Sequence, residues 1–136
     1  MTPVSEPGCY LLTMTRRLTP PLAALALLAA PAAADPSDIR DVTIEKTGMD
    51  WRVSVTLAHP DTGWDHYADG WRIEAEDGAV IGMRVLHHPH VQEQPFTRSL
   101  SSVMVPDGVW TVYIRARCSV DGWDAARTAV KVRPGL

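Results

Sequence analysis

Three of the five histidines of this chain lie within four residues, in the run His87-His88-Pro89-His90. Imidazole is among the commonest protein ligands for zinc, copper, iron and nickel. An extended backbone puts His88 and His90 on the same side of the chain, and Pro89 stiffens the link between them. Glu93 could add an oxygen ligand or orient an imidazole. The run therefore suggests a transition-metal site, although histidines that only hydrogen-bond within a tryptophan-lined loop would give the same pattern.

The elements that must position these side chains are strands. Apolar and polar residues alternate in seven short segments, a pattern typical of strands that are buried on one face. The predicted strands are 38–46, 51–58, 71–76, 80–86, 100–105, 109–118 and 125–133. In the strand 109–118 the alternation directs Trp110, Ile114 and Cys118 toward the core. The expected fold class is all-β: a seven-stranded antiparallel β-sandwich of the immunoglobulin or fibronectin type.

The connections between these strands alternate between tight turns and long loops. Tight turns are expected at Gly48, Asp77-Gly78 and Asp107-Gly108, and long loops at 59–70, 87–98 and 119–124. Because successive antiparallel strands reverse direction, the long loops should share one end of the domain. That end would hold every histidine of the chain. The candidate metal ligands are His59, His66, His87, His88, His90 and Cys118, with Glu93 and Asp121 in support.

Residues 1–34 are expected to form a signal peptide, with Met14 as the true start. Arg16-Arg17 precedes an apolar run at 22–30 that is too short to span a bilayer, and three alanines precede Asp35. Cleavage there would leave one domain, 35–136, exported to the periplasm or secreted. Cys118 would be its single cysteine. The expected cleavage site has no cysteine after it, so the sequence gives no sign of a lipid anchor.

The charge of the chain excludes one class of partner. The 136 residues carry a formal net charge of −3 and no basic stripe, which argues against nucleic-acid binding. No G-x-S-x-G sequence or phosphate-binding loop is present, so nucleophilic catalysis and nucleotide binding have no motif to support them.

Two segments resemble superoxide reductase, the iron domain of desulfoferrodoxin. His59-Pro60 followed by His66 and Trp71 is similar to the His-Pro segment of that family. The stretch 118–122 stands where the family has Cys-x-x-His-Gly, with Asp121 in place of the histidine. The resemblance implies an immunoglobulin-like sandwich in which His59, His66 and Cys118 bind iron. The His87–His90 run is outside the family's pattern.

The same segments resemble, more faintly, the sulfur-carrier-binding subunit of bacterial thiosulfate oxidation. That resemblance implies a periplasmic sandwich that binds a partner protein and no metal.

Three hypotheses follow from the sequence. The first is a periplasmic protein that binds a transition metal through histidines at the long-loop end, with copper or iron preferred and zinc next. The second is a module that uses the same loops to bind a periplasmic protein partner without metal, with aromatic anchors at Trp64, Phe96 and Trp123. The third is an iron enzyme similar to superoxide reductase.

Overall fold

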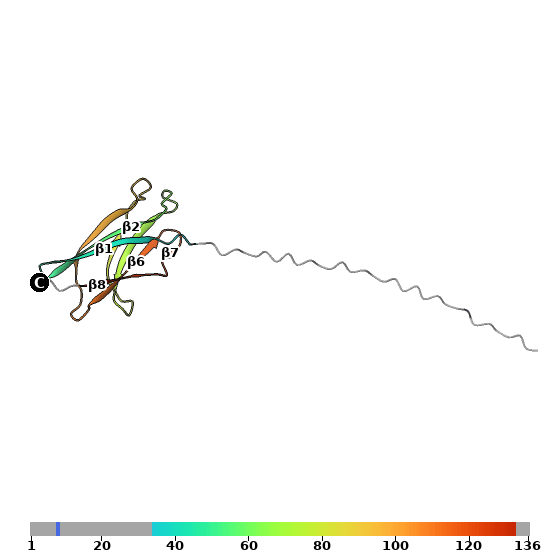
Figure 1. Cartoon of the computed structure of the whole chain (residues 1–136). Helices are drawn as coiled ribbons and strands as arrows, with labels where there is room; N and C mark the ends of the chain where they lie inside the picture. Colours follow the sequence, from blue (N-terminus) through green and yellow to red (C-terminus); the bar gives the residue numbers. More distant parts are fainter. Residues whose placement is uncertain (1–7, 9–33, 133–136) are drawn as a thin grey trace, which may run out of the picture. The chain divides into compact units, whose positions relative to one another are not determined.

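The structure is a computed structural model that describes Gly8 and residues 34–132 (Figure 1). The described residues contain strands and no helix. The strands are β1 (Asp38–Thr47), β2 (Asp50–Ala58), β3 (Ala68–Glu74), β4 (Val80–Val85), β5 (Phe96–Val103), β6 (Thr111–Cys118), β7 (Gly122–Trp123) and β8 (Thr128–Lys131).

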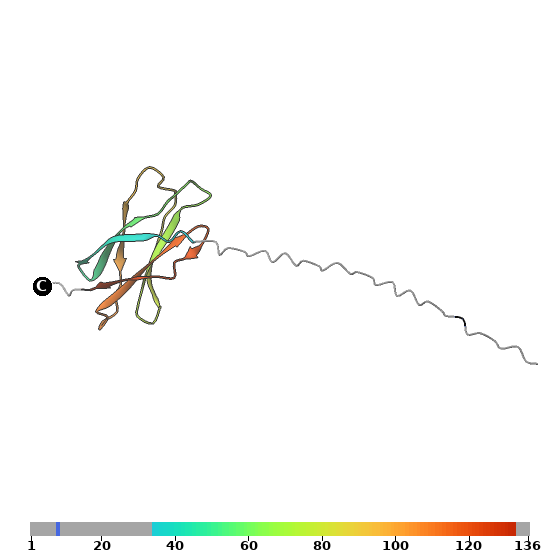
Figure 2. The same cartoon turned by 45° about the vertical axis from the view of Figure 1, so that its right-hand side comes forward.

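These strands form two antiparallel sheets. The first has the order β1-β2-β5; in the second, β4-β3-β6 continues with β7 and β8, which both pair with β6. The chain crosses from the first sheet to the second after β2, returns after β4 and crosses again after β5 (Figure 2). The all-β prediction is confirmed, and the two sheets provide the arrangement that a sandwich requires.

One hydrophobic core takes side chains from both sheets. In β2 the residues Val53, Val55 and Leu57 are fully buried, and in β3 and β6 the same holds for Ile73 and Ile114. In β2 and β6 the alternate residues are more exposed, as a two-residue period requires when one face of a sheet is covered.

The register places the long loops together at one end, as predicted. Ala68 at the start of β3 pairs with Cys118 at the end of β6, and Leu57 near the end of β2 pairs with Phe96 at the start of β5. Loops 59–67 and 86–95 project side by side in both views (Figures 1 and 2), and the backbone N–H of His59 donates to the Gln94 side chain at 3.1 Å.

The opposite end holds the tight turns. Gly48, Gly78 and Gly108 have φ values of 65°, 89° and 82°, a left-handed conformation that glycine adopts without steric cost. The turn predictions at these three positions agree with this geometry.

Several details of the predicted strands were wrong. The described residues contain eight strands rather than seven, because β7 lies inside the segment that we expected to be a loop. Strand β6 begins at Thr111, and Trp110, which was expected in the core, has 63% of its surface exposed. Strand β5 begins at Phe96, four residues before the prediction, so the histidine loop is correspondingly shorter.

The expected signal peptide falls outside the described residues, apart from Gly8 and Ala34. Within the described part of the chain, no helix could cross a membrane.

Candidate metal site

Two histidines and the cysteine of the domain converge at the long-loop end. One potential ligand atom from each of His59, His66 and Cys118 lies within 4.8 Å of the others. His59 directly follows β2, His66 lies two residues before β3, and Cys118 is the last residue of β6. Both sheets therefore contribute to the group, which we call the His-His-Cys group.

His59 is oriented by a buried carboxylate. Its Nδ1 lies 2.6 Å from Oδ1 of Asp61, and both side chains are completely buried. An ionised carboxylate only accepts hydrogen bonds, so Nδ1 donates to Asp61, and in the neutral imidazole the lone pair then lies on Nε2. Nε2 is also buried and has no hydrogen-bond partner among the described residues. A buried polar atom without a partner costs free energy, so its place in the fold calls for an explanation.

Asp61 ties three segments of the loop end together. Besides His59, its Oδ1 accepts the backbone N–H of Ala68 at 2.9 Å, and its Oδ2 accepts that of His90 at 2.8 Å. Carboxylates in this position fix the tautomer and the ring direction of metal-binding histidines. The sequence analysis did not single out Asp61 as a site residue; its spacing of two from His59, across a proline, was the available signal.

His66 reaches the group through a tight turn. The backbone of Gly63 pairs with that of His66, and Gly63 has a φ of 144°, which favours glycine. The rings of His59 and His66 meet edge to face with centroids 4.9 Å apart. Nε2 of His66 is buried without a hydrogen-bond partner in the described part of the chain, and Oδ2 of Asp121 lies 3.9 Å away. Asp121 therefore stands at the edge of the group.

Cys118 supplies a buried thiol. Its exposed fraction is 1%, and it forms no disulfide with another described residue. The backbone N–H of Val120 donates a hydrogen bond to Sγ at 3.4 Å. The next residue, Ser119, exchanges two hydrogen bonds with the backbone of Tyr67, one residue after His66. These bonds hold the segment that follows Cys118 against the His66 loop.

The spacing of the three donors suits a transition metal after a small contraction. Zinc–nitrogen and zinc–sulfur bonds of about 2.1 and 2.3 Å require donors about 3.5–4 Å apart around one ion. The observed limit of 4.8 Å exceeds that spacing by about 0.8–1.3 Å. Two neutral imidazoles and one thiolate are ligands that copper, iron and zinc all accept.

The run 87–90 is arranged differently. Nε2 of His90 accepts a hydrogen bond from Arg98 at 3.0 Å, and its ring stacks on Phe96 with a centroid distance of 3.8 Å. Burial lowers the pKa of His90 below its usual value, and the charges of Arg98 and His88 lower it further. Nε2 of His90 is therefore occupied by Arg98, whereas its Nδ1 is buried without a hydrogen-bond partner among the described residues.

The other members of the run point to solvent. His87 and His88 are exposed, and Nδ1 of His88 lies 3.2 Å from the carbonyl oxygen of Pro89. The Glu93 side chain is 60% exposed and pairs with Arg98 at 3.2 Å.

Of the eight candidate ligands, the structure brings three together and places Asp121 beside them. Within residues 34–132, none of the other four belongs to a group of three potential ligands. Their role in binding an ion stays a prediction.

A comparison with known proteins finds a relative in Halomicrobium mukohataei that is named "Putative lipoprotein". It is 36% identical over 100 residues, which are 73% of this chain and 49% of the relative. The chain thus spans about half the length of the relative that it matches. No protein-family model matches the chain, and no solved structure matches it significantly.

Proposed function

We propose that this domain binds a transition metal ion through Nε2 of His59, Nε2 of His66 and Sγ of Cys118. One observation carries the proposal: two imidazole nitrogens are buried without hydrogen-bond partners among the described residues, beside a buried thiol. An ion would satisfy all three donors at once. Without one, the fold would bear the cost of two orphaned polar atoms in a single place.

Copper or iron is preferred, with zinc next. A thiolate combined with two imidazoles is a soft ligand set, and trigonal His₂Cys sites are typical of copper proteins. Iron is supported by the resemblance to superoxide reductase, which points to the same His59, His66 and Cys118. Asp121 would serve as a fourth ligand, which tetrahedral zinc would need.

An exported sandwich of the immunoglobulin or fibronectin type is part of the same proposal. The division of β1-β2-β5 from the strands around β3 and β6 supports that fold type. The name of the Halomicrobium relative supports export, to the periplasm or outside the cell.

The test is a titration of the full chain with Cu(II), Fe(II) and Zn(II), followed by optical spectroscopy and elemental analysis. We expect one equivalent of metal and a visible sulfur-to-metal charge-transfer band with copper. His88→Gln is the matched control, because it removes an imidazole from the same end of the domain. No uptake at micromolar concentrations, or a loss of uptake in His88→Gln, would contradict the proposal.

A second candidate function is protein binding by the same loops. Trp64, Val91 and Val120 lie on the three loops and have 69%, 51% and 62% of their surfaces exposed. Phe96, which the sequence suggested as an anchor, is 2% exposed and cannot contact a partner. Under this alternative, Trp64→Ala should weaken capture of a partner from a periplasmic extract, while metal uptake stays unchanged.

A further inference from the structure

The outer face of the second sheet carries a layer of arginines. Arg72 from β3, Arg115 and Arg117 from β6, and Arg127 just before β8 form what we call the arginine face. Arg72 pairs with Arg115 across the two strands, so both side chains lie on the same side of the sheet. The neighbouring residues along these strands, Ile73 and Ile114, fill the core.

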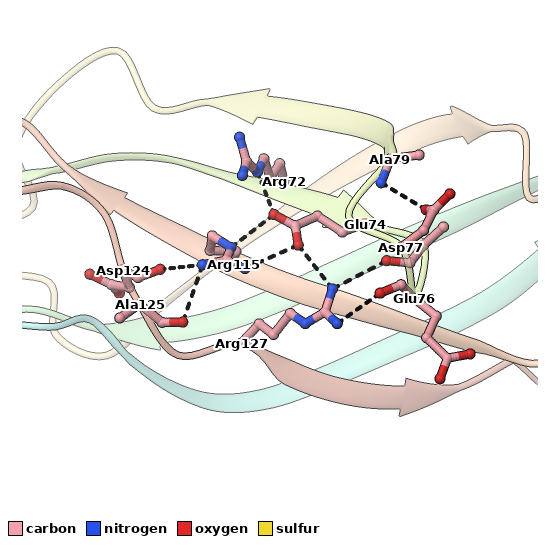
Figure 3. Close-up of polar contacts among 10 residues, drawn as sticks. Arg72, Glu74, Glu76, Asp77, Ala79, Arg115, Asp124, Ala125 and Arg127 are labelled. Carbon is pink, nitrogen blue, oxygen red and sulfur yellow. Dashed lines mark hydrogen bonds and ion pairs between the residues drawn. The ribbon is translucent and has the colours of Figure 1, made fainter.

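Glu74 organises three of these cations (Figure 3). Its carboxylate accepts hydrogen bonds from Arg72 at 2.6 Å, Arg115 at 2.8 Å and Arg127 at 3.2 Å, and its exposed fraction is 1%. Burial raises the pKa of Glu74, but the hydrogen bonds from Arg115 and Arg72 outweigh it and hold the pKa below the usual value. One charged carboxylate is therefore shared by three guanidinium groups.

The arginine face keeps an excess of positive charge. Arg117 forms a two-pronged ion pair with Asp69, with distances of 2.8 and 3.0 Å. Hydrogen bonds join the four guanidinium groups to two carboxylates, Glu74 and Asp69, and the charge of Arg115 also acts on the carboxylate of Asp124. The face therefore keeps more cations than carboxylates, on a chain whose net charge is −3. The outer face of the other sheet differs, because it pairs hydroxyl groups: Ser54 with Ser99 and Thr56 with Thr97, each at 2.7 Å.

Two of the arginines present unused donors at fixed positions. Arg72 uses only Nε, and NH1 of Arg117 makes no hydrogen bond with any described residue. Both guanidinium groups lie over the ring of Trp123, at 4.1 and 5.3 Å from its centroid. Their side chains are 23% and 34% exposed, so solvent reaches them. A planar guanidinium held in place by an aromatic ring is well suited to two-pronged binding of a carboxylate.

We propose that the arginine face binds an acidic segment of a protein partner, whose carboxylates pair with Arg72 and Arg117 around Trp123. Charge complementarity supports this occupant, and the fixed donors lower the entropy cost of binding. The proposal does not depend on the metal site.

The experiment measures binding of labelled poly-L-glutamate to the full chain without added metal. At about 0.01 M salt the Debye screening length is about 30 Å, so charges are only weakly screened. We expect saturable binding under these conditions, and we expect it to weaken steeply as salt is added. Arg72→Gln and Arg117→Gln should each reduce the affinity about tenfold, the size of a lost charge-assisted hydrogen bond. Arg52→Gln is the matched control, because Arg52 is an exposed cation on β2 in the other sheet.

Further arms separate the alternatives. Arg72→Lys keeps the charge but loses the planar fork, so we expect an affinity between those of wild type and Arg72→Gln; it also serves as the test if Arg72→Gln fails to fold. Stronger binding to phosphatidylglycerol vesicles than to polyglutamate would overturn the proposal in favour of a membrane surface. Absent binding, or an equal loss in Arg52→Gln, would also overturn it and leave the arginines a purely structural role.

Discussion

The two groups of histidines at the loop end share a residue type and little else. In the His-His-Cys group, the Nε2 atoms of His59 and His66 are buried and have no hydrogen-bond partner within the described chain. In the run 87–90, two imidazoles face solvent. The third, His90, accepts a hydrogen bond from Arg98 at Nε2, so its buried Nδ1, which has no partner among the described residues, carries a proton and not a lone pair. The contrast teaches that the density of imidazoles along a sequence is a poor guide to a metal site. What distinguishes a candidate ligand is a lone pair that the fold has buried and left available.

The largest effect is expected from Cys118→Ser. Loss of the soft thiolate should lower the affinity for copper by at least about a hundredfold and abolish the charge-transfer band, because a neutral hydroxyl is a poor ligand for soft metals. Competition with a chelator of known affinity measures the change. The melting temperature of the metal-free variant serves as the control for folding. If the folded variant bound copper as tightly as wild type, the His-His-Cys group would have no better claim to the metal than the run 87–90.

The next effect tests the orientation of His59. Asp61→Asn should lower metal affinity about 10–100-fold, the range seen when a partner of a metal-binding histidine is altered. An asparagine has one acceptor oxygen, so it cannot serve His59 and the backbone N–H of His90 at once. Parallel titrations of Asp61→Asn and wild type measure the loss. Equal affinities would show that the carboxylate does not orient the ligand.

The run 87–90 should matter for stability instead. His90→Ala removes the stacking on Phe96 and the contact with Arg98, and should lower the free energy of unfolding by about 1–3 kcal/mol. Urea denaturation measures this value, and metal affinity should stay within about twofold of wild type. A loss of metal binding in the folded variant would place His90 among the ligands and break the contrast.

A smaller effect concerns pH. The pKa of His90 is lowered in the folded state, so the unfolded chain binds more protons at acidic pH and stability falls below about pH 6.5. In His90→Gln the part of this pH dependence that comes from residue 90 should disappear. Denaturation curves recorded in steps from pH 7.5 to about 5 compare the two proteins. Identical pH profiles would show that His90 titrates as it does in the unfolded chain.

The smallest effect is expected for the exposed imidazoles. His87→Gln and His88→Gln should change stability by less than about 0.5 kcal/mol, as surface substitutions usually do. Metal affinity should also be unchanged. The double variant, measured by the same titration and denaturation, gives the most demanding form of this prediction. A clear loss of metal binding would show that His87 or His88 belongs to the metal site.

Much of the fold could be predicted because its signals are local. The alternation in β2 and the glycines at 48, 78 and 108 depend on neighbouring residues alone. Strand β5 was placed too late because its first residues, Phe96 to Ser99, mix polar and apolar positions. The hydroxyl pairs with β2, such as Ser54 with Ser99, cannot be read from either strand by itself.

The site could be predicted only in part. Strand parity gathered the histidines at one end, and the family resemblance pointed to His59, His66 and Cys118. What distinguishes those three from the other candidate ligands is the turn at Gly63 and the hydrogen bonds of Asp61, which join residues up to 29 positions apart. Such long-range contacts leave little trace in one sequence. The exposure of Trp110 was missed because the alternation of residues suggested that the strand includes it, whereas strand β6 begins one residue after it.

The bond from the backbone of His90 to Asp61 has a practical consequence for protein engineering. A designer who grafted residues 59–67 alone onto another scaffold would leave Oδ2 of Asp61 without its donor. The graft would then expose the carboxylate to water or let it turn, and His59 would lose its fixed direction. A graft of the site must therefore include loop 86–95, although this loop supplies none of the three ligands.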